Sequence, residues 1–385
     1  MPVIPRTREF HDELTAWRRD IHAHPELGFQ EQRTADLVAG KLAEFGIEVH
    51  RGVGKTGVVG VLRNGDGPSI GLRADMDALP IHEETNLPYS SRNAGLMHAC
   101  GHDGHTTMLL GAAKYLADTK NFKGTVNFIF QPGEEGIGGA LAMLNDRLFE
   151  RFPCDAIFGM HNRPGMPVGQ YAISPGVGMA GGAFFDITIT GKGAHGARPE
   201  ESVDPVLVAC HLGTALQSIV ARNVPPQDIA ALSVTRILSG DAYNVIPQTA
   251  TLAGTVRTMK RETMQLVEAN MKRLASHVAA GFGAEASVDF RVIFAPLVND
   301  ADHARDFADA AAGLVGEAKV NRNKPPANAS EDFSFMLEKV PGAYINLGNG
   351  EDSAPVHNPA YNFNDAAIPY GVALFASIVE RKLPK

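Results

Sequence analysis

The sequence predicts a protein of the α/β class with an inserted second domain. Apolar β-like runs alternate with amphipathic helical segments over residues 1–181 and again over 295–385, which is typical of a mixed, largely parallel sheet flanked by helices. Residues 182–294 have the order βαββαβ, which is typical of a ferredoxin-like α+β unit. The chain of 385 residues is also longer than one ordinary hydrophobic core supports.

The first part of the chain begins with two predicted helices. Apolar residues at 10, 14, 17 and 21 place one stripe on a helix over 8–23, which His24-Pro25 ends. A second helix over 31–45 stops at Gly46. The remaining predicted elements are strands over 57–62, 69–74, 125–130, 155–160 and 343–347, and helices near 103–117 and 138–149.

The inserted part has its own periodic pattern. Apolar residues at 185, 187 and 189 alternate with polar ones, which indicates a half-buried strand. Apolar residues at 264, 267, 271, 274 and 278 indicate a helix. The other predicted elements are a helix over 203–222 and strands over 231–238, 249–258 and 286–294.

Composition excludes several classes of protein. The net charge of −8 disfavours nucleic acid, whose phosphates would be repelled. Three cysteines form no disulfide framework and suit a reducing cytoplasm. No run of about 18 apolar residues is evident and the first six residues lack the apolar stretch of a signal peptide, so we expect neither a membrane span nor export.

The segment 97–105 (MHACGHDGH) gathers a thiol, three imidazoles and a carboxylate in nine residues. Thiolate and neutral imidazole are common ligands of divalent metals. Cys100 and His102, with one glycine between them, are suited to face the same site from a loop. Each residue alone is better explained by a buried loop whose polar groups satisfy one another, but the whole segment indicates a metal site.

Further polar residues follow predicted strands, and ligands in open α/β sheets bind beyond the carboxyl ends of strands. Neighbouring carboxylates point in different directions, so one of an adjacent pair suits a metal and the other suits proton transfer. A bare pair of glutamates is more often a solvated turn, and a lone histidine is more often structural, so the assignment depends on the whole set. The set is Asp75, Asp77, Glu134, Glu135, His161 and His357.

The inserted part contributes three more candidates. The segment 191–199 (GKGAHGARP) allows close backbone approach, and His195 is suited to donate a hydrogen bond to a developing oxyanion. A glycine-rich surface turn explains the same segment equally well. Asn244 and Arg257 are candidates for binding substrate, because the guanidinium fork suits a carboxylate. An ordinary cross-strand ion pair is the default interpretation of Arg257.

Taken together, these motifs resemble the metal-dependent peptidase and amidohydrolase family that includes aminoacylases and carboxypeptidases. More narrowly, the chain resembles the branch of hippurate hydrolase, N-acyl-amino-acid amidohydrolases and plant auxin-conjugate (IAA-amino acid) hydrolases. The matching segments extend over essentially the whole length and are 18–29, 72–80, 100–103, 131–136, 191–196, 330–333 and 357–359.

The resemblance implies a dinuclear-metal catalytic domain over 1–181 and 295–385 and a lid or dimerisation domain over 182–294. Two divalent ions are implied, which are zinc, manganese, cobalt or nickel. On matching positions Cys100 would bridge the ions, Glu135 and His357 would complete one ligand set, and His102 and His161 would complete the other.

The resemblance also assigns roles around the metals. Glu134 would be the general base, His195 would stabilise the oxyanion, and Asn244 and Arg257 would hold the substrate carboxylate. In dimeric members the histidine reaches across from the partner's lid, so we expect a homodimer or a dimer-based tetramer. Other branches carry a metal-binding His-x-Asp where this chain has Asp75-Met76-Asp77, and we therefore assign Asp75 and Asp77 to a supporting shell around the ligands.

The expected reaction is hydrolysis of an N-acyl or N-aroyl amino acid to a carboxylic acid and a free amino acid, by a metal-activated water with Glu134 as base. Three alternatives remain at this point. They are a thiol hydrolase that uses Cys100, a binding protein without activity, and a dipeptidase or carboxypeptidase with the same mechanism. The motifs surround the scissile bond and say little about the acyl group.

Overall fold

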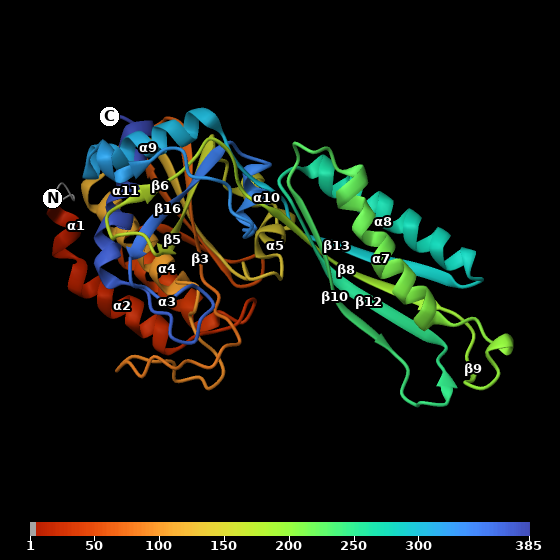
Figure 1. Ribbon diagram of the computed structural model, residues 1–385. Helices are drawn as coiled ribbons and strands as arrows, with labels where there is room; N and C mark the ends of the chain where they lie inside the picture. Colours follow the sequence, from red (N-terminus) through yellow and green to blue (C-terminus); the bar gives the residue numbers. More distant parts are fainter. Residues whose placement is uncertain (1–4) are drawn as a thin grey trace. The chain divides into compact units, whose positions relative to one another are not determined.

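The computed structural model describes residues 5–385, which form two compact units (Figure 1). Unit 1 extends to Gly178 and continues over Val298–Pro325 and Asp332–Lys385, and unit 2 comprises Met179–Leu297 and Pro326–Glu331. Residues 1–4, which are part of the N-terminal segment used to expect no signal peptide, lie outside the described residues.

Unit 1 holds a large sheet and most of the helices. Its helices are α1 (Pro5–Glu9), α2 (His11–Ala23), α3 (Gln32–Glu44), α4 (His102–Thr119), α5 (Gly139–Asn145), α6 (Leu148–Arg151), α9 (Ala301–Val315), α10 (Phe333–Leu337) and α11 (Ile368–Lys382). The strands of its sheet are β1 (Glu48–Val53), β2 (Gly57–Asn64), β3 (Ser69–Asp75), β4 (Gly124–Gln131), β5 (Ala156–Pro164), β6 (Tyr171–Ala172), β15 (Val320–Asn321) and β16 (Gly342–Gly350). Two short 3₁₀ helices, η2 (Glu317–Lys319) and η3 (Asp365–Ala367), complete it.

The sheet is mixed, with the strand order β1-β2-β4-β3-β5-β16-β6-β15. Strands β4, β3, β5 and β16 are parallel neighbours, whereas β1 and β2 run antiparallel at one side. Asp75 at the end of β3 lies opposite Gln131 at the end of β4, so the loops after these strands leave from the same edge. This arrangement confirms the predicted α/β class and places the polar loops together.

The core of unit 1 explains why its central strands have no polar alternation. Strands β3 and β4 are buried over most of their length, and α4 is buried on nearly all sides because it packs on β3, β4 and β5 as well as α2, α3 and α11. A strand with both faces covered needs a continuous apolar run rather than an alternating one.

Several element boundaries differ from the sequence expectation. The first helix is interrupted at Phe10, and the helix expected over 138–149 is divided into α5 and α6 with Arg147 in the left-handed region between them. Strand β1 was not expected, because its exposed, charged residues lack an apolar run. His161 lies within β5 rather than after its end, because pairing with β16 continues to Pro164.

Unit 2 contains a four-stranded antiparallel sheet with the order β10-β12-β8-β13. Its larger elements follow the chain order βαββαβ, and their apolar faces form a separate core cluster. They are β8 (Gly181–Thr190), α7 (Pro205–Asn223), β10 (Ala230–Ser239), β12 (Thr249–Thr258), α8 (Arg261–Gly281) and β13 (Glu285–Phe294). The smaller elements are β9 (Ala194–His195), η1 (Pro199–Glu201) and β11 (Val245–Ile246), and β7 (Gly176–Met179) and β14 (Leu297–Asn299) pair where the chain passes between the units.

The segment Pro326–Glu331 belongs to unit 2, although the sequence analysis placed it in the first domain. The reason is backbone pairing, because the Ala180 N–H donates to the carbonyls of Ala327 at 2.9 Å and Ala329 at 3.0 Å. The sequence pattern of a single segment cannot predict a backbone pairing between residues that are far apart along the chain.

Helix α7 is long and apolar enough to cross a membrane by length and composition, although polar residues interrupt it and it is not a continuous apolar run. Core helices of water-soluble proteins meet the same criterion. One face of α7, with Val208, Leu212, Leu216 and Ile219, is fully buried in the core of unit 2. This one helix is therefore weak evidence for a membrane span.

Candidate metal centre

Two groups of three potential ligands meet in unit 1, and they share one sulfur. Cys100, His102 and His161 form one group, and Cys100, Glu135 and His357 form the other. Within each group the ligand atoms all lie within 4.8 Å of one another. These are the two ligand sets implied by the resemblance, with Cys100 as their common member, and the structure brings all five side chains together.

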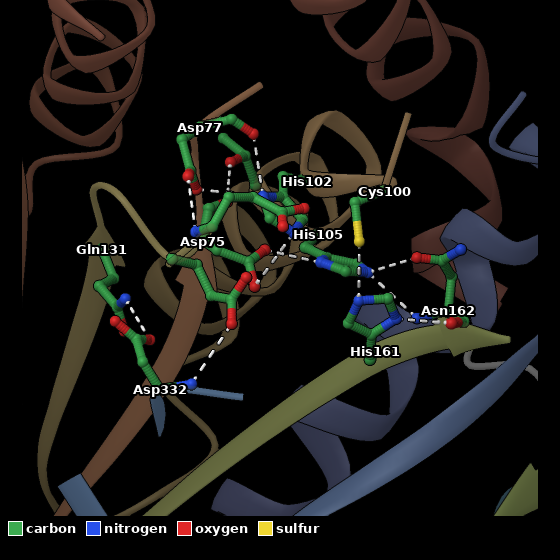
Figure 2. A network of polar contacts seen from close by, with 12 residues as sticks. Asp75, Asp77, Cys100, His102, His105, Gln131, His161, Asn162 and Asp332 are labelled. Carbon is green, nitrogen blue, oxygen red and sulfur yellow. Dashed lines mark hydrogen bonds and ion pairs between the residues drawn. The ribbon is translucent and has the colours of Figure 1, made fainter. Parts of the chain in front are cut away.

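The first group is held by the start of α4 and by β5 (Figure 2). Gly101 has a φ of 95°, which favours glycine, and this turn lets Cys100 precede the helix while His102 begins it. The Cys100 Sγ atom lies 3.4 Å from Nε2 of His161. His102 Nε2 is buried and has no hydrogen-bond partner among the described residues. A buried nitrogen in this state is the atom expected to coordinate a cation.

The second group depends on a strained loop. His357 has a φ of 64°, an unusual conformation for a residue with a side chain, and its N–H donates to the carbonyl of Ala99 at 2.7 Å. This backbone bond places the loop after β16 beside Cys100. The His357 Nε2 atom lies 3.2 Å from Oε1 of Glu135. Half of the His357 side chain is exposed, so this side of the centre is open to solvent.

Asp77 contacts one residue of each ligand group. Its backbone carbonyl and Oδ1 lie 2.9 Å and 3.2 Å from Nδ1 of His102, and its Oδ2 accepts the Glu135 N–H at 3.0 Å. These contacts engage Nδ1 of the imidazole and leave Nε2 to face the centre. The structure therefore places Asp77 where the sequence analysis proposed a supporting residue.

Asp75 is fully buried, and its Oδ2 atom lies 3.8 Å from Nε2 of His102. Its Oδ1 is 2.7 Å from Nδ1 of His105 and its Oδ2 is 2.8 Å from a guanidinium nitrogen of Arg73. Burial alone would raise the pKa of Asp75, but the charges of His102 and Arg73 hold it well below its usual range. Asp75 is thus an anion that is already paired, which fits a supporting position.

Several residues without a role predicted from the sequence lie around the potential ligands in the structure. His105 Nε2 accepts the Asn162 N–H at 3.0 Å, and the Asn162 side chain donates to the hydroxyl of Tyr361 at 2.6 Å. The spacing of His102 and His105, three residues apart on one helix face, was the available signal. No local pattern connects Asn162 and Tyr361, which are 199 residues apart.

The pKa values of His161 and Cys100 are consistent with cation binding. Burial and the neighbouring His105 lower the pKa of His161 to about 3, so its imidazole is neutral at physiological pH, as a ligand must be. Burial, with the nearby carboxylate of Glu135, raises the pKa of Cys100 well above its usual value. A bound cation would stabilise the thiolate form of Cys100. Sulfur, nitrogen and oxygen donors together fit a divalent transition metal.

Glu134 lies next to Glu135 in the sequence and is 6% exposed. It follows β4 in a turn where Gly133 has a φ of 56°, and the Gly133 N–H donates to Oε1 of the buried Glu31 at 2.9 Å. The Asp332 N–H donates to Oε1 of Glu134 at 3.3 Å. A carboxylate held in this way beside the ligands is suited to act as a base.

The three remaining candidates lie in unit 2, at two different ends of its sheet. The Gly196 N–H donates to the carbonyl of Asn244 at 2.7 Å, so Asn244 lies beside the exposed His195 on the β9–β11 ribbon. This ribbon continues from the end of the sheet where Thr249 pairs with Thr190. Arg257 pairs with Gly182 near the other end of the sheet. Eight residues of strand β12 separate Arg257 from Thr249, which is roughly 26 Å at about 3.3 Å per residue.

Arg257 does not form the cross-strand ion pair that was its default interpretation. Its guanidinium donates to the Thr255 hydroxyl and to the carbonyl of Val256 at 3.0 Å, and it lies 6.0 Å from the ring centre of Phe184. No salt bridge of Arg257 occurs within the described residues. Burial lowers the pKa of Arg257 from the ordinary arginine value.

Comparison with known proteins identifies close relatives. The model of peptidase family M20/M25/M40 matches residues 71–381. A hippurate hydrolase of Campylobacter jejuni is 45% identical over 385 residues, which is 100% of both chains. An N-acetylcysteine deacetylase of Bacillus subtilis is 40% identical, over 96% of this chain and 97% of the relative.

A solved structure agrees with this result. The YXEP protein of Bacillus subtilis, described as a dinuclear metal binding peptidase from the M20 family, has a TM-score of 0.85 and 37% identity, over 98% of this chain and 99% of that protein. The match covers the fold as well as the sequence, and it confirms the resemblance drawn from the motifs. The chain belongs to peptidase family M20/M25/M40.

Proposed function

We propose that the protein hydrolyses the amide bond of N-acyl or N-aroyl amino acids and releases a carboxylic acid and a free amino acid. The observation that carries this proposal is the pair of ligand groups that share Cys100, with Glu134 beside them. Hippurate and N-acetylcysteine, the compounds in the names of two relatives, are both amino acids that carry an acyl group on nitrogen. The family and these relatives support the reaction class.

In this proposal two divalent ions are held by five side chains. Cys100 would be shared by the two sets, Glu135 and His357 would complete one set, and His102 and His161 would complete the other. When bound, such ions lower the pKa of a water molecule and polarise a carbonyl oxygen. The mixture of sulfur, nitrogen and oxygen donors suits zinc, manganese, cobalt and nickel, so metal availability decides which is native.

Glu134 is the proton carrier of the proposed reaction. Its carboxylate accepts a proton from the attacking water and returns it to the amide nitrogen, so the amino acid leaves as a neutral amine. A positioned base of this kind contributes roughly 10²- to 10⁴-fold to the rate. The nearly complete burial of Glu134 excludes bulk water that would compete for the same proton.

We propose that the candidates in unit 2 bind the substrate, with His195 donating to the carbonyl oxygen and Asn244 and Arg257 contacting the carboxylate. The separation of Arg257 from the other two along one sheet is larger than an N-acyl amino acid. One substrate therefore does not reach both ends of the same sheet. This separation favours a homodimer, or a tetramer built from dimers, in which His195 and Asn244 serve the other subunit.

The surface of unit 2 supports a second copy as the partner. Strand β10 is an edge strand, and its exposed side chains include Ile237 and Leu238. A groove of about 670 Å³ beside it is lined by these residues together with Val245 and Pro247. An apolar edge strand with unpaired backbone groups is a template for pairing with another strand. We propose that the protein binds neither nucleic acid nor membranes. We also propose that it is located in the cytoplasm, which cell fractionation tests.

Two alternatives are less well supported. A thiol hydrolase needs a cysteine with a lowered pKa, but burial raises the pKa of Cys100. A dipeptidase or carboxypeptidase would use the same centre on a peptide bond, and a substrate panel distinguishes it from an amidohydrolase.

The test uses purified protein, metal analysis and a panel of substrates. We expect cleavage of hippurate or N-acetyl amino acids, loss of activity with 1,10-phenanthroline, and recovery when zinc or manganese is added back. Preference for unblocked dipeptides would favour the peptidase alternative. Full activity in metal-free protein would contradict the proposed function.

A further inference from the structure

Asp332 belongs to the motif 330–333, to which the proposed function gives no role. Its side chain is fully buried, and its N–H donates to Oε1 of Glu134 at 3.3 Å. Figure 2 shows Asp332 beside Gln131. The position of that N–H, and with it one contact of the proposed base, depends on how the Asp332 residue itself is held.

Three donors from three different elements hold the Asp332 carboxylate. Gln131 Nε2 at the end of β4 donates to Oδ1 at 2.7 Å, a guanidinium nitrogen of Arg73 in β3 lies 3.2 Å from Oδ1, and the Ala140 N–H of α5 donates to Oδ2 at 2.9 Å. A carboxylate bonded on both oxygens from three directions does not rotate without breaking a buried hydrogen bond.

Arg73 connects this arrangement to the other side of the centre. Its guanidinium contacts Asp75 at 2.8 Å, the Gln131 side-chain oxygen at 2.9 Å and Asp332 at 3.2 Å. All three charged side chains have no exposed surface. Buried ion pairs of this kind are weak contributors to stability, and an apolar cluster would serve the fold as well. The presence of these buried ion pairs is better explained by a role in positioning Asp332 and Asp75.

The chain connectivity gives a physical reason for such firm bonding. Asp332 is the first residue of unit 1 after the unit 2 segment Pro326–Glu331. The bonds to its side chain therefore fix the backbone at the residue where the chain re-enters unit 1.

We propose that Asp332 is a positioning residue for Glu134. Its side chain, held by Arg73, Gln131 and the Ala140 N–H, presents the backbone N–H that orients the base. The inference rests on the proposed function for the role of Glu134 as the base, and on the geometry alone for the hydrogen bond.

The first test is the substitution Asp332→Asn, which keeps the size of the side chain but removes its charge and one acceptor. We expect kcat to fall roughly 10- to 100-fold, the effect of a small misplacement of a reacting group, while KM and the two metals per subunit stay within about twofold. The milder Gln131→Leu should change kcat in the same direction. An unchanged kcat, or a loss that follows the metal content, would overturn the proposal.

The matched control is Asp365→Asn. Asp365 also pairs with a buried arginine, since the Arg18 Nε atom donates to it at 2.7 Å, but it contacts none of the ligands. We expect Asp365→Asn to lower the melting temperature and to leave kcat unchanged. Equal losses of kcat in Asp332→Asn and Asp365→Asn would show a general structural effect and would contradict the positioning role of Asp332.

A second readout does not need activity. Hydrogen exchange at the Asp332 amide should become at least about tenfold faster in Glu134→Ala, because its acceptor is gone, whereas amides of the following helix α10 should keep their protection. Equal exchange in both proteins overturns the hydrogen bond. If no N-acyl amino acid is cleaved, the proposed function fails, and this measurement still decides the geometry.

Discussion

At the residue scale, the chemistry of the centre depends on which atom of each side chain faces it. His102 has two ring nitrogens, and contact with Asp77 engages Nδ1 and leaves Nε2 toward Cys100. Glu134 and Glu135 are neighbours in sequence and both form a group with His102, whereas only Glu135 also belongs to the group with Cys100 and His357. The different surroundings of the two carboxylates support different roles, one as ligand and one as base.

The substitution Glu134→Gln tests this division. We expect kcat to fall by at least about 10²-fold, because the amide cannot accept the proton, with metal content kept at the wild-type level in elemental analysis. Glu150→Gln, an exposed residue of α6, is the control and should be indistinguishable from wild type. Loss of metal together with activity would instead make Glu134 a ligand.

At the element scale, the start of α4 is held by α2. His22 of α2 has its Nδ1 atom 2.8 Å from Oδ2 of Asp103, the second residue of α4, and its Nε2 atom 3.2 Å from Glu83. Arg18, one turn earlier in α2, lies 3.4 Å from the same Asp103 oxygen. This explains part of the motif 18–29, because these side chains fix the helix that begins with His102.

The His22 contacts predict a pH dependence of stability. Burial alone would lower the pKa of His22, but hydrogen bonds to Asp103 and Glu83 outweigh it and raise the pKa to about 9. The folded state therefore binds the proton more tightly than the unfolded state does. This stabilisation is complete below about pH 6.5 and is lost as the pH rises through about 9, a change on the order of 3 kcal/mol.

The measurement is chemical denaturation of metal-free protein between pH 6 and 10. The difference in unfolding free energy between wild type and His22→Gln should shrink between about pH 6.5 and 9 and become constant above that range. A difference that stays constant over the whole range would mean that His22 is not charged in the folded protein.

Elements also show how far the sequence could be interpreted. The expected strands over 69–74 and 125–130 and the helix over 103–117 agree with β3, β4 and α4 within two residues, because their apolar patterns are strong. Strand β1 and the break at Phe10 were not expected, since an exposed edge strand and a single irregular residue leave no periodic signal. The end of β5 was wrong because strand pairing, not composition, extends it past His161.

At the scale of the whole molecule, the separation of His195 from Arg257 within unit 2 makes the quaternary state testable. If His195 of one subunit serves Glu134 of the other, mixing inactive Glu134→Gln and His195→Ala subunits restores activity. The mixed dimers, half of the total, each contain one intact site, so about a quarter of wild-type activity is expected.

The control mixes Glu134→Gln with His102→Ala, both in unit 1, and should restore nothing. Light scattering establishes the size of each assembly. A monomer, or mixtures of Glu134→Gln and His195→Ala that remain inactive, would contradict the proposed exchange of residues between subunits.

The sequence by itself determined the family, the α/β class and the five potential metal ligands, because short motifs with unusual density of thiol, imidazole and carboxylate groups are local. Only the tertiary structure decided that Arg73 and Gln131 hold Asp332, whose N–H contacts Glu134. The physical reason is separation along the chain, since Arg73 and Asp332 are 259 residues apart and meet only through the packing of the sheet and its loops.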